Sequence, residues 1–161
     1  MEIINEKSIR ASFVNASRRE AAQLPIPKDL HKTDWENTDF LAWTDPRNGQ
    51  RSYAVVPIAD RVVGMVLTTA QTGSKQAMCS WCEDIIETSD VKMFSAKLAG
   101  AAGRKGNTVG TMIHDGFGCP RFARRMPTPQ EGGDPEQFVA TRVAKLRTNA
   151  GSFARRVAGL R

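Results

Sequence analysis

The first stretch with a clear hydrophobic pattern, residues 8–24, has the spacing of an amphipathic helix. Ser8 is a suitable N-cap, and Pro25 and Pro27 stop the helix after its last turn. The apolar residues that share one helical face are Ile9, Phe13, Ala21 and Leu24. We therefore expect residues 1–34 to form an N-terminal helix and a polar connection.

The pattern then changes to short apolar runs separated by turn residues. The runs "FLAW", "SYAVVPI" and "RVVGMVLTT" are rich in β-branched and aromatic residues, which predicts an antiparallel meander within residues 35–75. Pro57 cannot donate to a sheet, so it should lie at an edge or a strand end. Two further strands, "VKMFSAKLAG" and "TVGTMIH", flank a glycine-rich connection, "GAAGRKGN", that we expect to be flexible.

The last helical pattern is the most regular one. Asp134 and Pro135 form a cap and first turn, and Arg142, Lys145 and Arg156 point away from the apolar stripe. The segment "NAGS", residues 149–152, is a weak point where the helix is expected to kink or end. The stripe consists of Val139, Val143, Leu146, Ala150, Phe153, Val157 and Leu160. The expected fold is α+β, a single domain over residues 1–161, in which residues 76–161 hold the final strands and this helix.

Two pairs of potential metal ligands interrupt this pattern. Cys79 and Cys82 are two residues apart in "CSWC", and His114 and Cys119 are four apart in "HDGFGC", where two glycines permit a turn. Two short pairs of Cys and His are the usual ligands of a tetrahedral structural zinc site. All three cysteines of the chain and one of its two histidines fall into these pairs. Zn²⁺ is therefore the expected cofactor.

A redox-active dithiol and a cysteine nucleophile paired with His114 are the alternatives. A thioredoxin-like dithiol is expected to open a helix in a β-α-β setting, which the sequence around Cys79 lacks. A nucleophile would leave the other cysteines without a role. A filled four-ligand site has no open position for a substrate, so we expect the protein not to be an enzyme.

Charge and composition limit the possible partners and locations. The net charge of +6 comes from residues 121–161, where nine Arg or Lys face three Asp or Glu, whereas residues 1–120 are balanced. A basic segment suits an anionic partner. No apolar run is long enough for a membrane span, and the N-terminus lacks a secretory signal, so a cytoplasmic, monomeric protein is expected.

The cysteine knuckle, the following hairpin and the His-x4-Cys pair together resemble one known family. They are similar to the C-terminal treble-clef zinc-finger domain of the FusB-type elongation factor G-binding proteins, and "TDPRNGQRSYAVV" resembles the β segment that precedes that finger. The resemblance covers roughly residues 35–160, without the N-terminal helical bundle of the resistance proteins. It implies binding to elongation factor G, modulation of its interaction with the ribosome in translation, and a possible protective effect against fusidic acid.

Residues predicted to contact the partner follow from their positions. Trp81 lies between two ligands, where a side chain commonly points outward and can anchor an interface. Arg104 and Lys105 are expected at the tip of the hairpin connection, and Arg121, Arg124 and Arg125 form a basic cluster after Cys119. The alternative function is binding of ribosomal or other RNA through the basic C-terminal segment, although that segment lacks exposed aromatic residues for base stacking.

Overall fold

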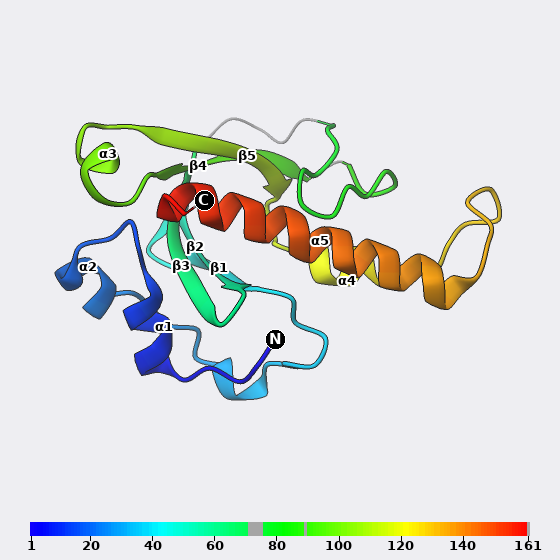
Figure 1. The fold of residues 1–161 in the computed structure, drawn as a ribbon, viewed down its shortest axis with the longest axis horizontal. Coiled ribbons are helices and arrows are strands. Elements are labelled where there is room, and N and C mark those ends of the chain that lie inside the picture. The colour runs from blue at the N-terminus through cyan, green and yellow to red at the C-terminus, as the bar shows by residue number, and fades with distance from the viewer. Residues whose placement is uncertain (71–75, 89, 161) are drawn as a thin grey trace.

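The computed structural model describes residues 1–70, 76–88 and 90–160, which form one five-stranded antiparallel sheet flanked by helices (Figure 1). The strands follow one another in the order β1-β2-β3-β4-β5. Their bounds are β1 Leu41–Asp45, β2 Asn48–Ile58, β3 Arg61–Thr69, β4 Val91–Lys97 and β5 Thr108–His114. The predicted α+β class and the antiparallel meander are confirmed, while residues 71–75 at the predicted end of that meander lie outside the described residues.

Both faces of the sheet are covered by packed side chains. Alternate side chains of β2 point into two separate hydrophobic clusters, one on each face. Tyr53 and Val55 join one hydrophobic cluster with the N-terminal segment. Ala54, Val56 and Ile58 join the other, larger cluster with the C-terminal helix and the cysteines. Successive side chains of a strand point to opposite faces, so a strand buried on both sides shows the nearly continuous apolar run seen in "SYAVVPI". Pro57 lies near the end of β2 as expected.

The N-terminal segment differs from the predicted single helix over residues 8–24. It forms α1 Glu6–Ser12, capped by Asn5, and α2 Arg18–Ala22, capped by Ser17. Between them the chain is extended and pairs with β3, where Val14 N donates to Gly64 O at 3.0 Å. The helix breaks because the backbone of β3 offers partners that local spacing cannot reveal.

The side chain of Asn15 bridges β3 and β4 where their backbones no longer pair with each other. These strands pair only at Thr68–Ser95 and Thr69–Phe94. The Asn15 amide donates to Val66 O and Lys97 O, both at 3.0 Å, and accepts from Val66 N at 2.8 Å. A side chain therefore takes the place of backbone hydrogen bonds in this gap.

The predicted flexible connection after β4 contains a short helix, α3 Gly100–Arg104. Gly103 is required there, because a Cβ atom at this position would lie 1.8 Å from Leu98 O. The remaining short elements are the 3₁₀ turn Leu30–Lys32 and α4 Cys119–Ala123.

The C-terminal helix α5, Pro135–Ala158, runs without a break across the sheet and beyond it (Figure 1). The expected weak point at residues 149–152 is instead a point of close contact. Gly151 is buried, and a Cβ atom added there would lie 3.6 Å from Ile58. The middle of the predicted stripe is buried, at Leu146, Ala150, Phe153 and Val157, whereas Val139, Val143 and Leu160 at its two ends are only partly buried. None of the helices in the described part of the chain combines the length and hydropathy that crossing a bilayer requires.

Candidate metal centre

The structure brings the four predicted ligands to one point in the core. The sulfur atoms of Cys79, Cys82 and Cys119 and a ring nitrogen of His114 all lie within 4.8 Å of one another. Cys79 Sγ is 3.6 Å from Cys119 Sγ, and Cys82 Sγ is 3.3 Å from His114 Nε2. All four residues are at most 2% exposed.

The first pair sits in a turn that β5 and its own backbone hold in place. Ser80 N donates to Met112 O at 2.7 Å, which ties the turn to the sheet. Glu83 N donates to Cys79 O at 2.9 Å with Glu83 in the left-handed region, φ 50°. Trp81 N points at Cys79 Sγ at 3.4 Å, a contact that favours the thiolate form.

The second pair joins the end of β5 to the start of α4. His114 is the last residue of β5 and Cys119 the first of α4. The residue with positive φ in this turn is Phe117, at 53°, rather than either glycine. Gly118 is needed for a different reason, because a Cβ atom there would meet the Phe122 ring at 2.8 Å. That ring in turn packs against His114, with 4.4 Å between centroids.

Asp90 orients the histidine from behind, and the sequence analysis missed it. Its Oδ1 lies 2.5 Å from His114 Nδ1, so Nε2 is left to face the sulfur atoms. A carboxylate on the far nitrogen of a ligand histidine is the usual outer partner in zinc sites. Val91 of β4 pairs with His114 of β5, so Asp90, which precedes Val91, lies beside the histidine. A prediction of the register between these two strands is the signal that could have identified Asp90.

The electrostatics of the four side chains suit a divalent cation. Hydrogen bonds from Cys119 and Cys82 lower the pKa of Cys79. Burial lowers the pKa of His114, but hydrogen bonds to the sulfur atoms of Cys79 and Cys82 raise it more, to about 11. The centre thus favours a thiolate at Cys79 and a proton on His114, and a metal ion can replace that proton. Three sulfurs and one imidazole nitrogen match the donor set of structural zinc and leave no ligand position for a substrate.

Trp81 does not point outward, so this part of the prediction is wrong. It is 1% exposed, and its ring meets Phe40 edge-on at 4.9 Å and lies 5.9 Å from Phe153. Asn149 of α5 donates to Trp81 O at 3.1 Å and to Glu83 Oε1 at 3.0 Å. The helix packs over the knuckle and turns the indole into the core.

Arg124 and Arg125 do not form a free basic cluster either. Arg124 makes two hydrogen bonds to Asp39, at 2.5 and 3.2 Å, and Arg125 Nε lies 2.7 Å from Asp84 Oδ1. Both carboxylates are buried, at 4% and 1% exposure. Arg125 also pairs with Glu131 at 2.7 Å.

Three basic residues of α5 also pair with acidic groups of the chain. Arg142 pairs with Asp84, Arg147 pairs with Asp39 and Lys145 pairs with Glu83. The hydrogen bonds to Asp84 from Glu87 N, Arg125 and Arg142 outweigh its burial and lower its pKa. The basic C-terminal segment is therefore partly neutralised by acidic groups that the chain itself brings to it.

Three predicted contact residues remain on the surface. Arg121 forms no ion pair with a described carboxylate and lies 4.8 Å from the Phe122 ring centroid. Arg104 and Lys105 are exposed at the end of α3. α3 follows Lys97, the last residue of β4. This end of the β4–β5 hairpin is opposite to the end beside the metal centre, where Val91 pairs with His114. Their roles as contacts stay predictions.

Comparisons with known proteins agree with the geometry of the centre. The solved structure of the fusidic acid resistance protein FusC superposes with a TM-score of 0.56 and 19% sequence identity, over 90% of this chain and 59% of the FusC chain. The chain thus spans less than two thirds of FusC, and the likeness concerns the fold. No curated protein matches the sequence. The sequence matches the model of the FBP C-terminal treble-clef zinc-finger family over residues 8–157, so the chain belongs to that family of zinc-finger proteins.

Proposed function

We propose that this protein is a zinc-stabilised binding module, not an enzyme, that binds elongation factor G and modulates its interaction with the ribosome. Membership of the treble-clef family over residues 8–157 carries the proposal. The closed donor set supports a structural rather than a catalytic role for the metal. Such a module acts without chemistry, because a ligand that prefers one conformation of its partner shifts that partner's equilibrium.

Exposed apolar side chains next to the metal centre supply a candidate contact surface. Met78, Ile85 and Ile86 are 54%, 66% and 56% exposed and belong to the segment around the cysteine knuckle. Glu87 N donates to Asp84 Oδ2 at 2.8 Å, a turn that leaves both isoleucines at the surface. Apolar side chains held on a rigid, metal-anchored turn are suitable for protein recognition.

Purified elongation factor G tests the proposal directly. We expect the zinc-loaded protein to bind it in isothermal titration calorimetry after nuclease treatment. Ile85→Ser combined with Ile86→Ser should weaken this binding at least tenfold without changing zinc content. Ile3→Ser is the matched control, because Ile3 is 79% exposed and lies on the N-terminal segment.

The possible outcomes separate the function from the surface. Absence of binding by the wild-type protein would overturn the proposed function. Binding that both variants retain would leave the function in place and move the contact surface elsewhere. Protection against fusidic acid is a property of FusC, and for this chain it would require its own growth assay.

A further inference from the structure

The net positive charge of the chain is concentrated at one end of the molecule, away from the metal centre. Six basic residues lie on three helices there: Arg18 and Arg19 of α2, Arg104 and Lys105 at the end of α3, and Arg155 and Arg156 of α5. Lys97 and Arg51 complete the set, and Glu20 is its one acidic residue. We call this surface the basic end. Eight positive charges against one negative give +7, whereas the whole chain carries +6, so all other residues together carry −1.

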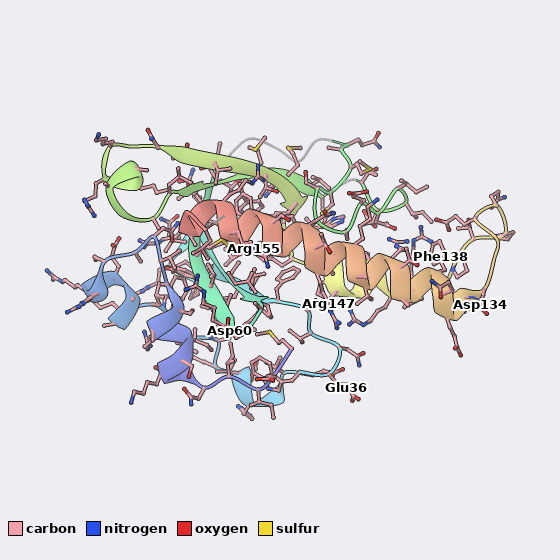
Figure 2. The ribbon with its side chains drawn as sticks, viewed as in Figure 1. Glu36, Asp60, Asp134, Phe138, Arg147 and Arg155 are labelled. Atoms are coloured by element: carbon pink, nitrogen blue, oxygen red, sulfur yellow. The ribbon has the colours of Figure 1, made fainter. Side chains whose placement is uncertain are left out.

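The elements of the basic end are in contact, although they are far apart in sequence. Asn15 Nδ2, just before α2, donates to Lys97 O at 3.0 Å, and Ala99 N donates to Val157 O of α5 at 2.7 Å. One hollow is lined by residues 14–17 together with Lys97 and Arg104. Figure 1 shows α2, α3 and the end of α5 at the same end of the molecule, and Figure 2 places Arg155 there and Asp134 at the opposite end.

These charges are available to a partner, unlike those next to the metal centre. Among the described residues no carboxylate pairs with any of the seven exposed cations; Arg51, which is partly buried, pairs with Glu20 at 3.4 Å. Around α4, by contrast, Arg124, Arg125 and Arg147 are bound to buried Asp39 or Asp84. The chain thus neutralises one group of arginines and leaves the other free.

The chemistry around the free charges favours nucleic acid over protein. A second hollow, of about 550 Å³, lies between Arg51 and Lys97 and is lined mainly by hydroxyl and amide side chains, including Gln50, Thr68, Ser95 and Thr108. None of the six large hydrophobic residues that are exposed in the described chain lines either hollow, so an apolar anchor of the kind that dominates protein interfaces is missing. Exposed aromatic rings for stacking single-stranded bases are missing from both linings too.

We propose that the basic end binds the sugar-phosphate backbone of double-helical RNA. Arginine and lysine would contact phosphates on either side of the hollow, and the hydroxyl and amide groups would reach the 2′-hydroxyls in the shallow minor groove. The surface differs from the Ile85–Ile86 surface proposed for elongation factor G, and the inference does not depend on that proposal. It also narrows the RNA site predicted on the basic C-terminal segment. Arg155 and Arg156 of that segment belong to the basic end, whereas its arginines near the metal centre are paired with acidic groups: Arg124, Arg125, Arg142 and Arg147.

Fluorescence anisotropy with a labelled 20-base-pair RNA duplex and the zinc-loaded full chain tests the proposal. If about four phosphates are contacted, the logarithm of the affinity should fall with a slope of about −3.6 against the logarithm of salt concentration. Between 50 and 200 mM KCl, affinity should then drop about 100-fold. A DNA duplex of the same sequence, a single-stranded RNA and poly-glutamate serve as competitors, and each should displace the RNA duplex at least tenfold less well than unlabelled RNA duplex.

A matched pair of variants locates the site. Arg104→Glu combined with Lys105→Glu should weaken RNA binding at least tenfold. Lys28→Glu combined with Arg61→Glu changes the net charge equally, at exposed residues outside both hollows, and should weaken binding less than threefold. Zinc content and circular dichroism confirm that both variants are folded.

The proposal fails if the wild-type protein does not bind the duplex at 100 mM KCl, or if both variants lose affinity equally. It also fails if DNA, single-stranded RNA or poly-glutamate competes as well as the RNA duplex. Competition by poly-glutamate would identify an acidic protein as the partner instead.

Discussion

The two faces of the sheet are stabilised by different means. On one face, α5 covers a core that contains the four ligand side chains and is bordered by Asp39 and Asp84 with their arginines. On the other face, the N-terminal segment packs Ile9, Phe13 and Leu24 against β1 and β2 in a smaller apolar cluster without metal ligands. β2 and β3 belong to both faces, so a change on either side acts on the same strands. The N-terminal face thus depends mainly on apolar packing, with one buried hydrogen bond between Tyr53 and Asp45, whereas the other face combines apolar packing with metal ligands and buried ion pairs.

The largest effect is expected from removing the metal. Structural zinc contributes on the order of 10 kcal/mol in small zinc domains, comparable with the whole stability of a domain. Treatment with EDTA, or Cys82→Ser, should therefore unfold both faces together through the shared strands. Amide hydrogen exchange of β2 and the fluorescence of Trp43 and Trp81 measure this. If the amides of the N-terminal face stay protected from exchange in EDTA, the two faces fold independently and the shared strands do not couple them.

A smaller but still large effect is expected at Asp84. Asp84→Asn leaves the guanidinium groups of Arg125 and Arg142 next to a neutral amide in a buried site. Breaking a buried pair in this way costs about 4 kcal/mol, which urea unfolding of the zinc-loaded protein measures.

Glu6→Gln is the control for Asp84→Asn. It removes the exposed Arg10–Glu6 pair on the other face, and an exposed pair of this kind contributes about 0.5 kcal/mol or less. A loss below about 1 kcal/mol for Asp84→Asn would mean that the ionic groups are not a main support of the metal-bearing face.

On the opposite face, packing alone should set the cost of substitution. Phe13 is 9% exposed and meets Trp43 and Tyr53 edge-on at 6.5 and 6.0 Å. Phe13→Ala should cost about 3 kcal/mol in urea unfolding, and Phe13→Leu less than about 1.5 kcal/mol. Equal costs for the two variants would show that Phe13 is not packed as tightly as its contacts imply.

The sequence predicted those features whose cause lies within a few residues. The ligand pairs are short motifs of chemically specific residues, and all four came together as their spacing implied. The buried acids were missed because their arginine partners are far away in sequence: those of Asp84 are 41 and 58 residues away, and those of Asp39 are 85 and 108 residues away. A local pattern carries no signal for partners at that distance.

The same reason explains the errors in orientation. The break between α1 and α2 depends on Gly64, about fifty residues away, which has no side chain to prevent the close approach of Phe13. Trp81 faces inward because Phe40 and Phe153 surround it. Spacing indicates which residues share a face of one element, but the element that covers this face is set by the fold.

The smallest effect is expected from a buried hydrogen bond on the N-terminal face, which joins a side chain of β2 to a side chain of β1. Tyr53 Oη donates to Asp45 Oδ2 at 2.6 Å, and burial, followed by this hydrogen bond, raises the pKa of Tyr53 to about 12. Because the folded pKa is raised above the unfolded value near 10, the contribution of the phenol is fully present below pH 10 and is lost as pH rises to about 12. Tyr53→Phe should cost about 1 kcal/mol at pH 8, and its difference from wild type should shrink between pH 10 and 12. Urea unfolding across this pH range measures the difference, and a constant difference up to pH 12 would contradict the role of Asp45 as acceptor.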